Sequence, residues 1–226
     1  MSDAASPKSL VPKSLVIAID GPAASGKGTL ARRLARELNL AHLESGLLYR
    51  AVALRLLREG KEPANAEAAT DAARRITPAE LADPALRDEA TSSAASVVSA
   101  HPTVREALIK LQRDFASHPP EWTQGVMIDG RDIGTVICPD AGIKIFLEAS
   151  PDIRAERRAK ELRQRGGNAI SSRILQDMKE RDARDRNRAA SPLKPAEDAF
   201  ILDNSNLDED GALQAALTFI RSRNGI

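Results

Sequence analysis

The feature that most constrains this chain is a glycine-bounded loop between an apolar segment and an amphipathic one. Residues 15–19 are all apolar and partly β-branched, which predicts a buried strand. From Lys27 to Glu37, leucines recur at the spacing of one helix face, which predicts a helix. The loop from Gly21 to Lys27 fits the pattern G-x-x-x-x-G-K, and strand, loop, lysine and helix in this order are typical of a phosphate-binding loop.

The residue types in this loop suit the binding of phosphate. Glycines let the backbone turn its N–H groups toward phosphate oxygens, and the helix N-terminus adds partial positive charge. Lys27 supplies a full charge. The usual motif has Ser or Thr directly after the lysine, whereas this chain has Gly28 there and Thr29 one position later. The alternative is a plain glycine-rich turn between a strand and a helix.

Length and composition exclude several classes of protein. The chain has 226 residues, enough for one substantial α/β domain with small insertions. A net charge of +1 and an aromatic content of 3% argue against a nucleic-acid-binding surface. The single cysteine, Cys138, excludes an intramolecular disulfide and suits a reducing cytoplasm, so we expect a cytoplasmic protein. There is no run of 18 apolar residues that would span a membrane, and residues 1–13 lack the apolar core of a signal peptide, which predicts a flexible leader.

The rest of the chain alternates strand and helix patterns, which predicts a parallel sheet with right-handed crossovers. Further strands are predicted over 40–43, 126–128, 143–147 and 200–202. Helices are predicted over 47–59, 63–71, 78–88, 89–99, 103–116, 151–165, 171–185 and 209–222. The stretch 60–118 has no strand pattern and indicates a helical insertion. We therefore expect one domain, 14–226, with a core of 14–44, 119–153 and 190–226, an insertion of about 45–118 and a lid of about 154–189.

Arginines indicate what the second substrate carries. Arg131 follows a predicted buried strand, at the sheet edge where open α/β sheets bind ligands. Residues 154–188 hold 12 Lys or Arg against 6 Asp or Glu. Such a run is usually a solvated helix with mixed-charge pairs, and a nucleic-acid patch is another alternative. Behind a phosphate-binding loop, we interpret it as a lid that closes over phosphates, with Gly166-Gly167 as its hinge.

Taken together, these motifs closely resemble the bacterial cytidylate kinases, a branch of the nucleoside monophosphate kinases. The resemblance covers nearly the whole chain after the leader. It rests on Asp20-Gly21-Pro22 with Gly26-Lys27-Gly28-Thr29, Ser45-Gly46 with Tyr49-Arg50, Ser96, Val104-Arg105-Glu106, Asp129-Gly130-Arg131-Asp132, Lys179-Glu180-Arg181-Asp182 and Arg184-Asp185-Arg186-Asn187-Arg188. It implies a P-loop NTPase-type parallel sheet with a helical NMP-binding insertion and a short lid. The implied activity is ATP-dependent phosphorylation of CMP and dCMP.

The resemblance also implies the site residues. ATP would be bound by Gly21, Pro22, Ala23, Ala24, Ser25, Gly26, Lys27, Gly28 and Thr29. CMP would be bound by Ser45, Tyr49, Arg50, Ser96, Arg105, Arg131, Asp132, Arg181, Asp185 and Arg188. The catalytic cations would be Lys27, Arg131, Arg157, Arg158 and Arg188. Mg²⁺ would bind Thr29 and, through water, Asp129.

Two departures from the family pattern and two alternatives remain. Glu44 stands where an Asp is usual, and the segment 60–90 is shorter than in family members that carry a small sheet there. Asp20 is expected to support the loop, and His42, His101 and His118 are expected to be bystanders.

The alternatives are another P-loop small-molecule kinase, uridylate- or shikimate-like, and a nucleotide-regulated RNA-binding protein. We expect a monomer without nucleic-acid or membrane partners.

Overall fold

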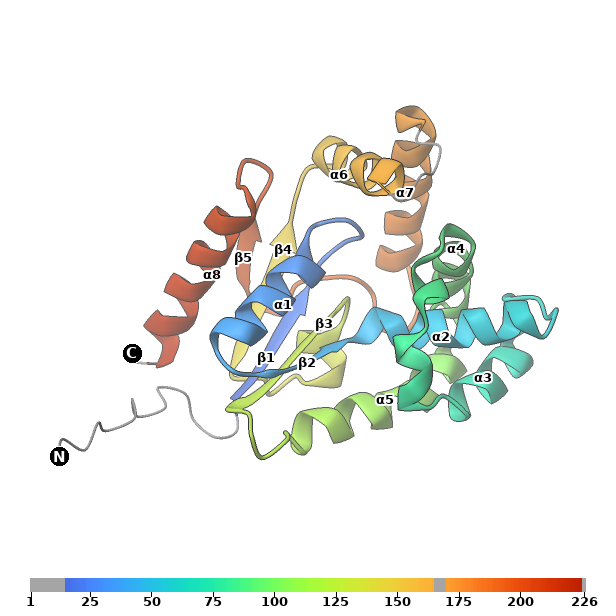
Figure 1. Cartoon of the computed structure of the whole chain (residues 1–226), viewed down its shortest axis with the longest axis horizontal. Helices are drawn as coiled ribbons and strands as arrows, with labels where there is room; N and C mark the ends of the chain where they lie inside the picture. Colours follow the sequence, from blue (N-terminus) through green and yellow to red (C-terminus); the bar gives the residue numbers. More distant parts are fainter. Residues whose placement is uncertain (1–14, 165–169, 225–226) are drawn as a thin grey trace.

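A computed structural model describes residues 15–164 and 170–224 of the chain. Five parallel strands form one sheet in the order β2-β3-β1-β4-β5 (Figure 1). The strands are β1 Leu15–Asp20, β2 Ala41–Glu44, β3 Gly125–Gly130, β4 Ile143–Glu148 and β5 Phe200–Asp203. The predicted parallel sheet is confirmed. Its central strand β1 leads directly into the glycine-rich loop.

Helices make up most of the remaining described structure. They are α1 Lys27–Glu37, α2 Ser45–Arg58, α3 Ala66–Arg74, α4 Glu89–Val98, α5 Pro102–Ser117, α6 Pro151–Gln164, α7 Ser171–Arg186 and α8 Glu209–Asn224. Among the described residues, no helix combines the length and the apolar character that crossing a membrane would need. The predicted leader 1–13 and the predicted hinge Gly166-Gly167 lie outside the described residues.

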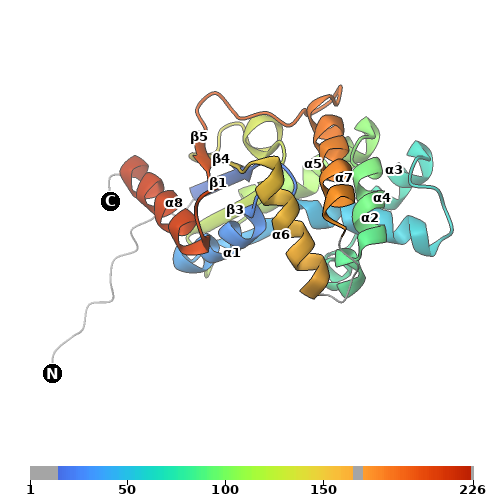
Figure 2. The same cartoon turned by 90° about the horizontal axis from the view of Figure 1, so that it is seen from above.

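Apolar side chains cover both faces of the sheet. On one face, α1 and α8 pack together against β1 and β4, with Leu34, Leu217 and Ile145 almost fully buried (Figures 1 and 2). On the other face, Ile128 and Ile133 are buried in a second apolar cluster. This burial on both sides explains why the strands read as continuous apolar runs rather than alternating ones.

The insertion has a hydrophobic core of its own. Leu48, Val52 and Leu56 of α2 are fully buried against α3, α4 and α5. In Figure 1 these helices form a lobe beside the sheet, while α6 and α7 stand above the carboxyl ends of the strands. The described residues between β2 and β3 form helices and turns without a strand, as the sequence predicts for 60–118.

The structure differs from the sequence prediction in two segments. The helix predicted over 78–88 is instead two short 3₁₀ turns, Pro78–Ala82 and Pro84–Arg87. Pro84 disfavours helical backbone at Asp83, so the turns remain separate. A single π-helical turn over Ile133–Ile137 was not predicted, because five residues are too few to show a period.

Candidate active site

The glycine-rich loop occupies the carboxyl edge of the sheet, between Asp20 and Lys27. Gly26 caps α1 with φ of 90°, and Ala24 has φ of 55°, so the loop uses left-handed backbone at two positions. At Gly21, a Cβ would lie 2.3 Å from the Leu147 carbonyl oxygen, a distance that real Cβ atoms do not adopt. Glycine is therefore required at this position by the close approach of β4.

The loop is held from behind through its own carbonyl groups. The Lys27 ammonium donates to the Pro22 carbonyl at 3.1 Å, and the Arg154 guanidinium donates to that of Ala23 at 3.2 Å. The Ser25 carbonyl accepts from the Asn204 amide at 2.9 Å and from Arg157 at 3.4 Å. Three of the four bonds come from α6 or the segment after β5, so distant parts of the chain set the shape of the loop.

Arg154 and Asp182 form a buried ion pair that joins α6 to α7. The Arg154 Nη2 to Asp182 Oδ2 distance is 2.7 Å, and the two side chains are 3% and 6% exposed. Arg154 also donates to the Ala149 carbonyl at 3.0 Å. Because Arg154 reaches the loop as well, it ties the two helices above the sheet to the phosphate-binding loop.

Arg154→Ala is expected to lower the free energy of unfolding by about 3–5 kcal/mol, because it leaves the Asp182 carboxylate buried and unpaired. The double variant Arg154→Met with Asp182→Leu removes both charges and should recover part of that loss. Urea unfolding followed by circular dichroism measures both. A loss below about 1 kcal/mol for Arg154→Ala, the value of an exposed pair, would contradict this assignment.

A cluster of cations lies beside the loop and faces the insertion. Its members come from α1, α2, the segment after β3, α6, α7 and the residues after α7, and are Lys27, Arg50, Arg131, Arg158, Arg181 and Arg188. Burial, together with Arg131, Arg50, Arg158 and Arg188 nearby, lowers the pKa of Arg181 to about 9. Burial and neighbouring arginines lower the pKa of Arg188 to about 10 and that of Lys27 well below its ordinary value. Repulsion among these closely spaced and largely half-buried cations indicates a site built for a polyanion.

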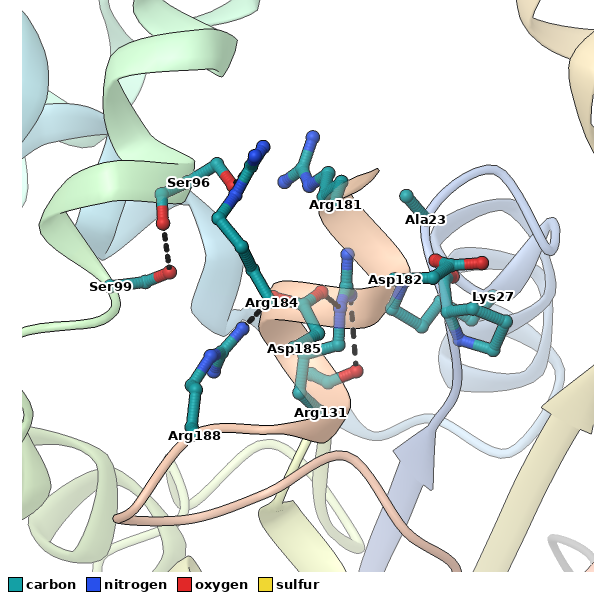
Figure 3. A network of polar contacts seen from close by, with 12 residues as sticks. Ala23, Lys27, Ser96, Ser99, Arg131, Arg181, Asp182, Arg184, Asp185 and Arg188 are labelled. Atoms are coloured by element: carbon teal, nitrogen blue, oxygen red, sulfur yellow. Dashed lines mark hydrogen bonds and ion pairs between the residues drawn. The ribbon is translucent and has the colours of Figure 1, made fainter. Parts of the chain in front are cut away.

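Asp185 fixes two of these cations. Arg131 Nε donates to Asp185 Oδ2 at 2.8 Å, and Arg188 donates to the other carboxylate oxygen (Figure 3). Asp185 is 2% exposed. Asp185 is expected among the substrate contacts, and in the structure its two carboxylate oxygens accept from arginines.

A second buried pair lies between α5 and the π turn. Arg105 Nη2 is 2.5 Å from Asp132 Oδ2, and the two side chains are 4% and 6% exposed. The Arg105 guanidinium also lies 5.3 Å from the centre of the Tyr49 ring. Ser96 is 4% exposed and accepts from Arg184 at 3.4 Å. The structure thus brings the predicted base-contacting residues to one side of the cation cluster.

Asp20 holds the segment that carries Arg131 and Asp132. Its two carboxylate oxygens accept from the backbone N–H groups of Ile133 and Gly134, both at 2.8 Å. Burial raises the pKa of Asp20 to about 7, against the effect of these two bonds. Asp20 is expected to support the glycine-rich loop. In the structure its carboxylate instead supports the turn after the neighbouring strand β3.

Other predicted residues contact protein groups. Arg157 donates to the side chain and carbonyl of Asn204, at 3.0 and 2.8 Å. Arg158 pairs with Glu89 on α4 and with Glu161. Ser45 Oγ donates to the Asp129 carbonyl at 2.7 Å. Arg157 thus lies against the segment after β5, and Arg158 faces the insertion.

His42 and Glu44 have defined contacts at the edge of the site. His42 Nε2 lies 2.7 Å from Asp129 Oδ1, so this histidine, expected to be a bystander, holds a carboxylate of the site. Glu44 lies 3.0 Å from Arg87 and 3.5 Å from Arg32. Its longer side chain thereby joins α1 to the turn before α4.

Thr29 and Asp129, the ligands expected for Mg²⁺, both offer oxygen atoms, which this ion prefers. Asp129 is 3% exposed at the end of β3, and its carboxylate raises the pKa of the nearby Lys27 against the larger effects of burial and Arg131. Thr29 Oγ1 accepts a long bond of 3.4 Å from Arg32. The described residues hold no group of three or more His, Cys, Asp or Glu side chains suited to a metal. One carboxylate and one hydroxyl match an ion that takes most of its ligands from water and substrate phosphates.

Comparisons with known proteins agree with these motifs. A family model described as cytidylate kinase matches residues 17–222. A cytidylate kinase of Rhodospirillum rubrum is 53% identical over 206 residues, 91% of this chain and 97% of that protein. One of Paramagnetospirillum magneticum is 54% identical over 210 residues, 93% of this chain and 99% of that protein. The crystal structure of a gluconokinase from Sinorhizobium meliloti shares the fold, with a TM-score of 0.51 at 15% identity and 95% of each chain covered.

Proposed function

Since the chain belongs to the cytidylate kinase family, we propose that it transfers the γ-phosphoryl group of ATP to CMP and dCMP, producing CDP and dCDP. The observation that carries this proposal is the cation cluster between the glycine-rich loop and the Arg105–Asp132 pair. One nucleotide's phosphates bind at the loop, and the acceptor's base lies at the pair. The two phosphate groups then meet among the arginines.

The acceptor needs no general base. A nucleoside monophosphate is largely dianionic at pH 7, so its phosphate oxygen is already a nucleophile. Catalysis therefore consists of alignment and of balancing the charge that spreads over the transferred group. Lys27 supplies that charge from the start of α1 and Arg131 from the segment after β3. Arg158, Arg181 and Arg188 supply it from α6, α7 and the residues after α7.

The base is recognised by the second buried pair. Cytosine offers an amino donor at N4, which Asp132 or Ser96 accepts, and acceptors at O2 and N3, which Arg105 reaches. Uracil has a carbonyl in place of the amine and leaves a buried acceptor unpaired, so it is disfavoured.

Mg²⁺ is the proposed cofactor, held by Thr29 and, through water, by Asp129. When bound, it would neutralise charge on the β and γ oxygens of ATP. His42 holds the Asp129 carboxylate in place. Arg154 and Asp182 keep α6 and α7 above the loop, where they exclude water from the phosphates. All proposed contacts come from one chain, and we propose that the enzyme acts as a monomer.

The proposal is tested by following ADP release with ATP and Mg²⁺ while CMP, dCMP, UMP, AMP, GMP and shikimate are offered in turn. Fast turnover with CMP and dCMP and little with UMP supports both the activity and the base recognition. Comparable turnover of UMP overturns the assignment of Arg105, Asp132 and Ser96. A lack of turnover with every acceptor overturns the proposed function.

Arg105→Ala is expected to raise KM for CMP by about 10- to 100-fold, the loss of one charged hydrogen bond, while KM for ATP changes little. Lys110→Ala, on the exposed side of the same helix, is the matched control and should behave as wild type. Initial rates at saturating second substrate measure both constants. An equal rise of KM for the two substrates would argue against base recognition by Arg105.

A further inference from the structure

One face of α4 meets the arginines of α6 and α7. Glu89, Ser92 and Ser96 are spaced by three and four residues and therefore share a helix face. Glu89 pairs with Arg158, and the Ser92 hydroxyl accepts from Arg181 at 3.4 Å. Figure 3 shows the neighbouring contact, in which Arg184 reaches Ser96. Of the three α4 residues, only Ser92 contacts two members of the cation cluster.

The Ser92 hydroxyl is shared by two guanidinium groups. Arg50 Nη2 donates to Ser92 Oγ at 3.1 Å, and Arg181 Nη1 donates to the same oxygen at 3.4 Å. Ser92 is 3% exposed, so water does not compete freely for that oxygen. Arg50 comes from α2 of the insertion and Arg181 from α7, and Arg50 is also held by the Leu86 carbonyl at 2.8 Å. The hydroxyl thus fixes the relative position of two guanidinium groups that come from α2 and α7.

The chemistry of this acceptor differs from that at Asp185. A hydroxyl oxygen has two lone pairs, so it can accept from both arginines while remaining neutral. Asp185 pairs with Arg131 and Arg188 and offsets part of their charge. The Ser92 hydroxyl orients the charges of Arg50 and Arg181 without adding a negative charge of its own. Burial lowers the pKa of Arg50, and burial with neighbouring arginines lowers that of Arg181 to about 9. Both cations therefore remain available to an incoming anion.

We propose that Ser92 is a positioning residue for the acceptor substrate. It sets the spacing and orientation of Arg50 and Arg181 so that both guanidinium groups receive the phosphate of the nucleoside monophosphate. This inference rests on the proposed function and names a residue that acts on the acceptor through these two arginines.

The experiment compares Ser92→Ala with Ser93→Ala, an exposed neighbour on the same helix. Ser92→Ala is expected to raise KM for CMP about tenfold, the value of one charged hydrogen bond, with KM for ATP and the unfolding midpoint close to wild type. Ser93→Ala should leave all three unchanged. Ser92→Thr retains the hydroxyl and should recover most of the CMP affinity.

A second variant tests the neutrality of the acceptor. Ser92→Asp places a carboxylate between the two arginines, so it should raise the unfolding midpoint and weaken CMP more than Ser92→Ala does. A Ser92→Ala enzyme with wild-type KM for CMP would overturn the inference, as would a parallel loss for ATP and CMP. If wild type does not phosphorylate CMP, the proposed function fails. Calorimetry with inorganic pyrophosphate then decides the Ser92 inference, which weaker binding by Ser92→Ala supports and equal binding overturns.

Discussion

Replacing Lys27 with alanine is expected to lower kcat by a factor of about 10³, comparable to the loss of one preorganised charge donor in a phosphoryl-transfer site. Lys27 is 9% exposed at the start of α1, and its ammonium donates to the carbonyl of Pro22 in its own loop. The charge is therefore already in place when the nucleotide arrives. A water molecule in the space left by the side chain would bring a dipole instead of a full charge.

The same substitution separates catalysis from stability. Burial and Arg131 lower the pKa of Lys27, which means that the charged form is held at a cost in the folded protein. Lys27→Ala should therefore leave the unfolding midpoint unchanged or raise it. Steady-state ADP release and differential scanning calorimetry on one preparation give both values. Turnover within tenfold of wild type would exclude Lys27 from the reaction, and Lys61→Ala, at an exposed pair, serves as the control.

Arg181→Met is expected to lower kcat/KM for CMP by about 100-fold while stabilising the protein without ligand. The activity falls because a charged donor to the acceptor phosphate is lost, which is worth about 1.5–3 kcal/mol. The stability rises because Arg181 is surrounded by Arg131, Arg50, Arg158 and Arg188. For a chain of this length, each 1 kcal/mol gained raises the unfolding midpoint by about 2–4 °C. Arg173→Met, on the exposed side of α7, is the matched control.

The pH dependence of that stabilisation follows from the sign of the pKa shift. Burial and the nearby arginines lower the pKa of Arg181 from its ordinary value to about 9 in the folded protein. Below pH 9 the folded state holds the charge at full cost, and as pH rises above 9 the cost diminishes. The difference in unfolding midpoint between Arg181→Met and wild type should therefore be largest near pH 7 and shrink toward pH 10. A constant difference across this range, or a lower midpoint for the variant at pH 7, would contradict the repulsion.

The architecture could be predicted because its signals are local and repeated. The leucines of α1 recur at helical spacing, and the helix spans Lys27–Glu37 as predicted. The strands are short apolar runs bounded by polar or glycine residues, so their number and order along the chain were predicted, with differences of at most two residues at their ends. The π turn at Ile133–Ile137 was missed because five residues are too few to show a period, and because Asp20, which accepts from its first N–H group, lies 113 positions away.

Site residues could be predicted where they belong to a sequence motif. They could not be predicted where their role depends on a contact with a distant residue. Arg105 and Asp132 were expected through the family resemblance and lie in contact. Ser92 and Asn204 have common side chains in unremarkable sequence, and only the fold shows that they hold arginines. In the sequence, Arg154 is one arginine of a basic run, and nothing there indicates that Asp182 lies beside it.

The way in which the glycine-rich loop is held has a consequence for which substitutions it tolerates. The side chains that hold the loop donate hydrogen bonds to the backbone carbonyl oxygens of Pro22, Ala23 and Ser25. Every amino acid has such a carbonyl group. Ala23 should therefore accept many side chains in a saturation library without loss of shape. Position 24 differs, because its φ of 55° favours Gly or Asn and penalises β-branched residues. Some variable positions of the loop should therefore tolerate substitution. Arg154 and Asn204 should not, although they lie far away in the chain, because their side chains hold the loop.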